Sequence, residues 1–376
     1  MRLLRNGDMK VLVTGSNGFI GNNLRVHLSE RKEIEVVTFS RDHDLGSLGS
    51  KLNGVDFVFH LAGVNRPKNV AEFALGNADL TSELCLAIIQ TKRLIPVIYT
   101  SSVQAELDNP YGQSKKAAEQ ALIDFSANSE SPVYLFRLPN IFGKWCKPNY
   151  NSAVATFCYN IAHNLPIQIN DQVSKIRLAY VDDLVKQFIN IMDGALVEPG
   201  FNNVNPVYEV TVGDLAEKIR LFKNSRQSLL TEPVGTGLDR ALHSTYLSYL
   251  EPEQFSYQLT KHEDPRGVFV EILRTKNSGQ FSYFTAHPGI TRGGHYHHTK
   301  TEKFLVLKGN ALFKFRNVLT DDSYEIKTSD DVPQVVETVP GWTHDITNVG
   351  EDEMIVMLWA NEIFDRESPD TYAKPL

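Results

Sequence analysis

Short apolar runs alternate with helix-like segments between residues 10 and 138, and the character of the sequence changes after about residue 250. Strands are expected at 10–14, 34–39, 55–62, 96–100 and 133–138, and helices at 20–30, 80–91 and 111–125. Strands that alternate with helices at this spacing predict βαβ units. The expected fold of this part is therefore an α/β, doubly wound parallel sheet of the Rossmann type.

After residue 250 the strand-like segments follow one another without a convincing helix between them. They lie at 267–273, 280–284, 304–307, 310–315, 334–339 and 354–359, and glycine, proline and aspartate turns separate them. This pattern predicts an all-β sandwich or small barrel. With a boundary around Glu251-Pro252-Glu253, the predicted domains are 9–248 and 252–376.

Composition narrows the class of protein. Hydrophobic residues make up 42% of the 376 residues and charged residues 22%, which favours a packed globular protein. The net charge of -7 argues against a nucleic-acid binder. Three widely spaced cysteines indicate neither a disulfide framework nor a thiolate zinc site. Because no run has membrane-spanning length either, a cytoplasmic protein without membrane insertion is expected.

A glycine-rich turn, Gly15-Ser-Asn-Gly18-Phe-Ile-Gly21, follows the first strand and opens the first helix. Glycines in this position permit a tight turn and let the backbone approach a pyrophosphate. The helix N-terminus adds oriented N–H groups for the anion. The turn therefore predicts nucleotide binding, with a plain turn as the alternative.

The second strand ends at Phe39-Ser40-Arg41, where an NAD enzyme usually carries an acidic residue. A guanidinium suits a 2′-phosphate through charge-assisted hydrogen bonds, so Arg41 favours NADPH over NADH. A solvated surface arginine is the alternative, and the adjacent Asp42 weakens the contrast.

Tyr111 and Lys115 are four residues apart on a predicted helix and therefore share a face. A neighbouring ammonium is expected to lower the pKa of the tyrosine, which could then exchange a proton with a substrate hydroxyl or carbonyl. Upstream, Ser101 and Ser102 end a strand, and either hydroxyl could bind the same oxygen. Their alternative role is a turn or a helix cap.

The order of glycine turn, strand-end serine and Tyr-x-x-x-Lys resembles the extended short-chain dehydrogenases/reductases. Supporting stretches are His60-Leu-Ala-Gly63, Arg137-Leu-Pro-Asn-Ile-Phe-Gly143 and Tyr180-Val-Asp-Asp183. The resemblance implies Tyr111 as acid, Lys115 on the nicotinamide ribose and Ser102 as the serine. It places Asn140 near the nicotinamide or the substrate. It implies these cofactor-binding residues: Gly15, Asn17, Gly18, Phe19, Ile20, Gly21, Arg41, Leu61, Ala62, Gly63, Tyr111 and Lys115.

One departure from that family is the spacing between Ser102 and Tyr111. Only eight residues separate them, fewer than extended members usually have. The loop over the substrate is therefore expected to be short.

Five of the eleven histidines lie after residue 286, and three of them fall between 295 and 298. In a strand, alternation would put His295 and His297 on one face. Together with Glu302 and His344, they offer imidazole and carboxylate ligands for zinc or another divalent first-row metal. The alternative is a cluster of ordinary hydrogen-bonded histidines.

This region resembles the metal-binding cupins. Gly289, His295, His297, Glu302 and Gly309 match the first cupin motif, and Pro340-Gly341 with His344 and Asn348 resembles the second.

The same region also resembles the cupin-fold epimerases of deoxysugar biosynthesis. That likeness implies Arg266 and Arg292 as diphosphate contacts and His295 as the base that removes a proton beside a ketone. The two resemblances differ on His295, which is a metal ligand in one and the base in the other. One imidazole nitrogen cannot serve both purposes.

Along nearly the whole chain, this arrangement resembles the bifunctional capsular-polysaccharide enzymes of the CapF/WbjC type. The resemblance implies C3 epimerisation of a UDP-2-acetamido-2,6-dideoxy-4-hexulose in the cupin. NADPH-dependent reduction of the C4 ketone to the L-talose derivative would follow, on the route to UDP-N-acetyl-L-fucosamine. It also suggests a homodimer that pairs through the cupin.

Three other interpretations remain for the cupin. It could only bind sugar or drive dimerisation beside a single-activity reductase. It could be an iron-dependent oxygenase, or its metal could be purely structural.

Overall fold

A computed structural model describes residues 9–67, 69–264, 267–270, 273–275, 279–362 and 367–376. Contacts divide the chain into two compact units. The first contains the residues up to 141 and 177–208, and the second contains 142–176 and 209–376. The chain passes between the units at strands β6 (Asn140–Phe142), β7 (Lys175–Tyr180) and β9 (Tyr208–Thr211).

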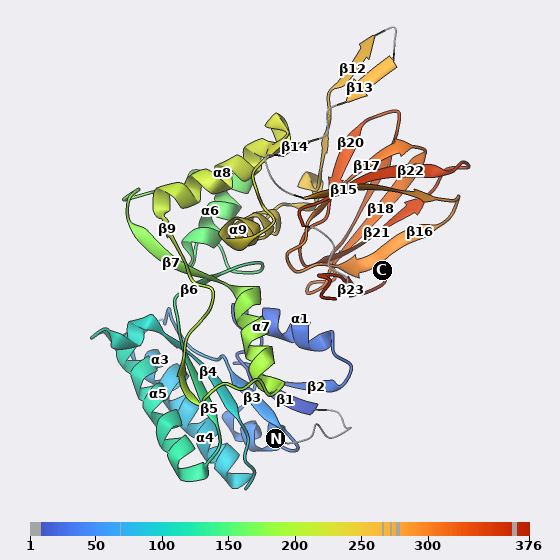
Figure 1. Cartoon of the computed structure of the whole chain (residues 1–376). Helices are drawn as coiled ribbons and strands as arrows, with labels where there is room; N and C mark the ends of the chain where they lie inside the picture. Colours follow the sequence, from blue (N-terminus) through green and yellow to red (C-terminus); the bar gives the residue numbers. More distant parts are fainter. Residues whose placement is uncertain (1–8, 68, 265–266, 271–272, 276–278, 363–366) are drawn as a thin grey trace. The chain divides into compact units, whose positions relative to one another are not determined.

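The first unit is built on a six-stranded sheet in the order β2-β1-β3-β4-β5-β8 (Figure 1). Every pairing in this sheet is parallel. The strands are β1 (Met9–Thr14), β2 (Ile34–Phe39), β3 (Phe57–His60), β4 (Val97–Ser102), β5 (Val133–Leu138) and β8 (Gly200–Asn202). The helices of this unit are α1 (Phe19–Ser29), α2 (Leu48–Lys51), α3 (Ala71–Phe73), α4 (Leu80–Gln90), α5 (Pro110–Ser129) and α7 (Val181–Met192), with short turns η1 (Leu45–Ser47), η2 (Ala74–Asp79) and η3 (Val103–Glu106).

Helices cover both faces of this sheet. On one face, Leu24 of α1 and Phe188 of α7 pack against strand residues such as Phe59. On the other face, Leu84 of α4 and Leu122 of α5 pack in a separate buried cluster. A sheet buried on both faces explains why its strands read as continuous apolar runs. The predicted doubly wound α/β fold agrees with this arrangement.

The second unit contains a sandwich of two five-stranded sheets, with orders β11-β20-β17-β22-β15 and β19-β18-β21-β16-β23. All pairings within them are antiparallel. The first sheet comprises β11 (Ser256–Gln258), β15 (Gln280–Ala286), β17 (Glu302–Lys308), β20 (Gln334–Glu337) and β22 (Met354–Ala360). The second comprises β16 (Thr291–Tyr296), β18 (Asn310–Asn317), β19 (Ser323–Ser329), β21 (Trp342–Asn348) and β23 (Tyr372–Ala373). The sequence predicts an all-β sandwich or small barrel, and the structure has the sandwich.

Smaller strands accompany the sandwich. They are an antiparallel pair, β12 (Lys261–Asp264) with β13 (Gly267–Val270), and a short parallel pair, β10 (Leu230–Thr231) with β14 (Arg274–Thr275).

Aromatic side chains fill the space between the two sheets. Phe304 of β17 lies 5.7 Å from Phe313 of β18, measured between ring centroids. Every second residue of β18 is buried, which is the period-2 pattern of a half-buried strand. Phe255 contacts Phe315 and Trp342 edge to face, at 5.5 and 5.0 Å.

The second unit also holds helices α6 (Ala153–Ala162), α8 (Val212–Ser228) and α9 (Gly237–Leu247), and the turn η4 (Pro252–Gln254). The sequence analysis assigned no element to residues 139–250 and so missed these helices and α7. Local signals were present, because Ser152 caps α6 and Thr211 caps α8 through side-chain hydrogen bonds. The domain boundary between 248 and 252 stays a prediction, since the compact units are defined by contacts and divide the chain elsewhere.

No helix among the described residues is long and apolar enough to cross a membrane. Cys85, Cys146 and Cys158 are free thiols.

A buried ion cluster joins α8 to the sandwich within the second unit. Lys303 of β17 pairs with Glu337 of β20, and Arg226 of α8 lies 3.2 Å from the same carboxylate. The Lys303 ammonium also donates to the Tyr257 hydroxyl at 3.0 Å. Burial alone would raise the pKa of Glu337, but the two cations outweigh burial and lower it. The cluster tolerates burial because each charge has a partner.

Replacement of Glu337 by alanine should destabilise the protein strongly, because it leaves buried cations without a counter-ion. The expected cost is about 3–5 kcal/mol in the free energy of unfolding. Denaturant unfolding measures the change. Glu209→Ala is the control, because both side chains of the Glu209–Lys175 ion pair are exposed. This variant should leave the unfolding midpoint unchanged. Equal midpoints for Glu337→Ala and wild type would contradict the role given to the cluster.

Candidate active sites

The glycine-rich turn between β1 and α1 requires glycine for steric reasons. Gly15 has φ +66°, and a Cβ there would lie 2.6 Å from the Ala62 backbone nitrogen. A Cβ on Gly21 would lie 2.3 Å from the Gly15 carbonyl oxygen. The N-cap of α1 is Gly18, which offers no side-chain hydrogen bond to the first turn. The first N–H groups of α1 are thus suited to a phosphate, and the turn fits a dinucleotide.

The residues after β2 differ in their hydrogen bonds and in their exposure to solvent. The Ser40 hydroxyl donates to the Asp42 carboxylate at 3.2 Å, and the Ser40 N–H donates to His43 Nδ1 at 3.1 Å. Arg41 is exposed. The Asp42 carboxylate, which could compete for a ribose, therefore accepts a hydrogen bond from its neighbour, whereas Arg41 is accessible to solvent.

Tyr111 and Lys115 occupy the first turns of α5, with Lys115 buried and Tyr111 half-buried. The Lys115 ammonium donates to the Thr100 carbonyl at 2.9 Å and to the Tyr99 hydroxyl at 3.3 Å. It also lies against Gly63, where a Cβ would be 2.9 Å from Lys115 Nζ. The structure thus brings the helix motif beside the loop that follows β3.

The pKa of Tyr111 moves opposite to the sequence-based expectation. Burial raises it, and a hydrogen bond with Ser102 offsets only part of the rise. Lys115 does not lower it, because the ammonium points to Thr100 and Tyr99. Burial also lowers the pKa of Lys115 to about 8. Tyr111 is therefore a protonated phenol, which is the form that a proton donor requires.

The two serines at the end of β4 have different partners. Ser101 is buried and donates to the Glu119 carboxylate, which Arg137 binds at 2.7 and 2.9 Å. Ser102 hydrogen-bonds with Tyr111 and accepts from the Gln104 N–H at 3.1 Å. This geometry favours Ser102 as the serine of the site. The sequence analysis overlooked Glu119, although it lies four residues after Lys115 on the same helix face.

The second site gathers four potential metal ligands within the second unit. One ligand atom from each of His295, His297, Glu302 and His344 lies within 4.8 Å of the others. His297 Nε2 is 3.1 Å and His344 Nε2 is 3.6 Å from Glu302 Oε2. His297, Glu302 and His344 are buried, and His295 is half-buried.

His297 reaches this cluster by a different route from the one expected. β16 ends at Tyr296, with a register shift between Gly293 and His295, so strand alternation does not place His297. The turn after β16 carries it, and the Gly341 N–H donates to its carbonyl at 3.0 Å. Gly341 has φ +80°, and a Cβ there would lie 2.7 Å from the Trp145 ring.

The cluster fits a divalent metal. Both ring nitrogens of His344 are buried without a hydrogen-bond partner in the protein, which is unfavourable unless a ligand binds there. Burial and the neighbouring imidazoles lower the pKa of His295 to about 4, so it is neutral. Lys300 Nζ lies 3.0 Å from Glu302 Oε1, which leaves Oε2 facing the histidines. Imidazoles with one carboxylate form a donor set for zinc.

The described residues that are predicted to bind substrate make none of the contacts given for the two clusters. Asn140 is exposed and donates to the Arg177 carbonyl at 3.2 Å. Arg292 is exposed in β16, with its guanidinium 5.3 Å from the Phe284 ring centre. Arg266 lies outside the described residues.

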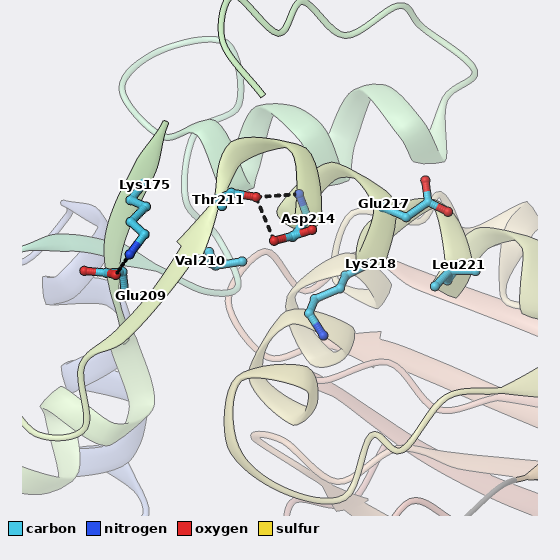
Figure 2. Close-up of a pocket in the computed structure, with 8 residues that line it drawn as sticks. All are labelled: Lys175, Glu209, Val210, Thr211, Asp214, Glu217, Lys218 and Leu221. Carbon is cyan, nitrogen blue, oxygen red and sulfur yellow. Dashed lines mark hydrogen bonds and ion pairs between the residues drawn. The ribbon is translucent and has the colours of Figure 1, made fainter. Parts of the chain in front are cut away.

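A pocket of about 460 Å³ lies between β9 and the start of α8, and no residue of either cluster lines it (Figure 2). Its charged side chains pair with their neighbours. Lys175 pairs with Glu209 at 2.7 Å, and Thr211 donates to Asp214 at 2.7 Å. We therefore assign no site to it.

Comparisons with known proteins match the N-terminal and C-terminal parts of the chain to two different families. Residues 11–204 match the NAD dependent epimerase/dehydratase family, and residues 262–372 match the polysaccharide biosynthesis C-terminal domain. The chain is 60% identical over 365 residues to UDP-2-acetamido-2,6-beta-L-arabino-hexul-4-ose reductase from Pseudomonas aeruginosa, covering 97% of this chain and 98% of the relative.

Solved structures are similar to this chain over nearly its whole length or over part of it. The capsular polysaccharide assembling protein CapF from Staphylococcus aureus is 41% identical with a TM-score of 0.68, covering 98% of this chain and 100% of that one. UDP-glucuronic acid 4-epimerase from Bacillus cereus, at 19% identity and a TM-score of 0.52, shares the fold over 57% of this chain and 84% of its own. The predicted fold class is confirmed.

Lys115→Met should stabilise the protein without cofactor at pH 7. Folding lowers the pKa of Lys115 from 10.5 to about 8, so the buried cation destabilises the folded state below about pH 8. This destabilisation decreases as the pH rises from about 8 to 10.5, because the unfolded state loses the same proton there. The free energy of unfolding should rise by up to about 3 kcal/mol at pH 7, since each pKa unit corresponds to about 1.36 kcal/mol. Loss of the hydrogen bond to Thr100 reduces this gain. Thermal unfolding at pH 7 and 9.5 tests this, with the exposed Lys116→Met as control. A variant less stable than wild type at pH 7 would refute the expectation.

His344→Ala should weaken metal binding, because it removes one imidazole from a closed donor set. The affinity should fall by more than the roughly 10–100-fold that loss of an outer partner typically costs. Competition with a metal-sensitive dye measures the change, and the exposed His287→Ala serves as control. If both variants bind metal like wild type, the cluster is not a metal site.

Proposed function

Because the chain belongs to the NAD dependent epimerase/dehydratase family, among its CapF-type members with a C-terminal polysaccharide biosynthesis domain, we propose that it is a bifunctional nucleotide-sugar enzyme. Its substrate is a UDP-2-acetamido-2,6-dideoxy-4-hexulose. The observation that carries the proposal is the presence of two separate reactive clusters, Ser102 with Tyr111 and Lys115, and the four ligands around Glu302. A reductase that is 60% identical over nearly the whole chain supports the substrate class.

The cofactor of the first site is NADPH. The glycine turn and the open N-terminus of α1 suit the pyrophosphate, and the exposed Arg41 suits a 2′-phosphate. Lys115 lies beside the backbone of Gly63, where it can bind the nicotinamide ribose. Asn17, Phe19, Ile20, Leu61 and Ala62 complete the expected contacts.

Reduction at this site needs a proton on O4 of the sugar while bound NADPH supplies the hydride to C4. Tyr111 donates that proton, since burial keeps the phenol protonated. Ser102 hydrogen-bonds Tyr111 and can bind the same oxygen. The product is the C4 alcohol of the L-talose derivative.

Epimerisation belongs to the second site. His297, Glu302 and His344 hold a divalent first-row metal, for which zinc suits the donor set. When bound, such a metal supplies a Lewis acid for the charge that develops on the ketone oxygen. His295 is neutral and the most exposed member, so it can take the C3 proton as a base or complete the ligand shell. Return of a proton to the opposite face inverts C3.

The order of steps follows from the chemistry. The C4 ketone acidifies the proton on C3, so epimerisation precedes reduction. Reduction removes the ketone and fixes the new configuration. Arg266 and Arg292 are proposed contacts for the diphosphate, where a guanidinium can bind in a bidentate manner. The pathway is capsular polysaccharide synthesis toward UDP-N-acetyl-L-fucosamine, in the cytoplasm, by a homodimer formed through the β-sandwich.

A second candidate is a single-activity reductase whose sandwich only binds sugar or drives dimerisation. The name of the 60% identical relative favours it, since that name states a reductase alone.

Product analysis in deuterated water separates the two candidates. Without NADPH, the enzyme should place deuterium at C3 of the UDP-4-keto-sugar. With NADPH it should also form the C4 alcohol. Tyr111→Phe should lose reduction, by roughly 100-fold or more for a general acid, and retain exchange at C3. His297→Ala should lose exchange at C3, and it should retain NADPH-dependent reduction when the C3-epimerised ketone is supplied.

His295→Ala then decides the role of His295. If it is the base, the variant keeps its metal and loses C3 exchange. Absence of C3 exchange in the wild type under both conditions would eliminate the epimerase and leave the single-activity reductase.

A further inference from the structure

The C-terminal segment, residues 370–375, is bound along the strand that carries His295. β23 pairs with β16, so that Ala373 lies opposite His295 and Tyr372 opposite Tyr296. The Lys374 N–H donates to the Gly294 carbonyl at 2.8 Å. Arg316 of β18 donates to the Pro375 carbonyl at 2.7 Å. Backbone contacts thus hold this segment on the sheet at the edge next to the metal ligands.

Asp370 attaches the start of the segment to the turn between β16 and β17. Its Oδ1 accepts from the His298 N–H at 2.9 Å. Its Oδ2 accepts from the Thr299 and Lys300 N–H groups, both at 2.7 Å, and from the Thr299 hydroxyl at 2.9 Å. Successive N–H groups that converge on one carboxylate form a strong anion-binding turn. This turn lies between the ligands His297 and Glu302.

The main chain of Asp370 contacts the ligand itself. The Asp370 carbonyl oxygen lies 2.5 Å from His297 Nδ1. A carbonyl can only accept, so His297 carries its proton on Nδ1. With a proton on Nδ1, Nε2 is the nitrogen that faces the cluster, 3.1 Å from Glu302 Oε2, and it is the one available to a metal. A hydrogen bond of this kind fixes the tautomer and orientation of a metal-binding histidine.

We propose that Asp370 is a positioning residue for the metal, and that metal binding and docking of residues 370–375 are thermodynamically coupled. The carboxylate anchors the segment, the anchored carbonyl selects the His297 tautomer, and that tautomer binds the metal. The inference rests on the metal site of the proposed function. Because coupling between two binding events is reciprocal, the metal must in turn hold the C-terminal segment in place.

Metal affinity of full-length variants tests the first half of this coupling. Asp370→Ala removes the anchor, and the zinc affinity measured by competition with a dye should fall by roughly 10–100-fold. Asp370→Asn keeps an acceptor for part of the turn and should lie between Asp370→Ala and wild type. Ser368 is exposed and lies two residues before Asp370, so Ser368→Ala should bind zinc with the affinity of the wild type. An unchanged affinity in Asp370→Ala would overturn the proposal.

Hydrogen exchange of the wild-type protein tests the second half without any variant. Zinc should slow exchange at the Lys374 amide and at the His298–Lys300 amides, which the segment and its anchor engage. Equal exchange with and without bound zinc would overturn the coupling.

The two hypotheses fail differently. A wild type that binds no divalent metal contradicts the proposed function itself. A wild type that binds zinc as tightly as the Asp370→Ala protein contradicts the coupling alone.

Discussion

Burial of ionisable side chains beside fixed polar partners is the constraint on which both clusters depend. Lys115 is buried with a carbonyl and a hydroxyl as partners, and Glu302 is buried with a lysine and two imidazoles. A charge in such a place is costly unless its surroundings compensate it. The partners of Lys115 come from β4, which packs in the buried cluster of the first unit, and those of Glu302 come from β21 and from the turn between β16 and β17.

The same constraint gives the two clusters opposite acid–base character. Burial raises the pKa of Tyr111 and keeps a proton on it, whereas burial lowers the pKa of His295 and keeps a proton off it. One site thus offers a proton donor and the other a proton acceptor at neutral pH. A keto-sugar that loses a proton at one carbon and gains one on its oxygen needs both.

The second unit contains three helices together with the sandwich. α6, α8 and α9 belong to it together with both β-sheets, and the Arg226–Glu337–Lys303 cluster lies between α8 and the sandwich. The turn at Gly341, which leads to the potential ligand His344, packs directly on Trp145. The strands that carry the potential ligands therefore pack on helices and loops that precede them by up to about 200 residues in the sequence, roughly the length of one ordinary domain.

The sequence alone determined what local patterns encode. It predicted β2 at Ile34–Phe39 and β5 at Val133–Leu138 with the observed bounds, because both segments are short and rich in β-branched or aromatic residues, which favour strands. It also identified the four residues that meet as potential metal ligands, since their types and spacing carry chemistry without coordinates.

Tertiary structure decided the rest. It turned Ser101 toward Glu119 and left Ser102 beside Tyr111, a distinction that two adjacent serines do not show in sequence. It raised the pKa of Tyr111 through burial, and it directed the Lys115 ammonium to the Thr100 carbonyl of β4. It brought Asp370 to His297, although more than 70 residues separate them, through the pairing of β23 with β16 and the bonds of the Asp370 carboxylate to the turn that follows β16.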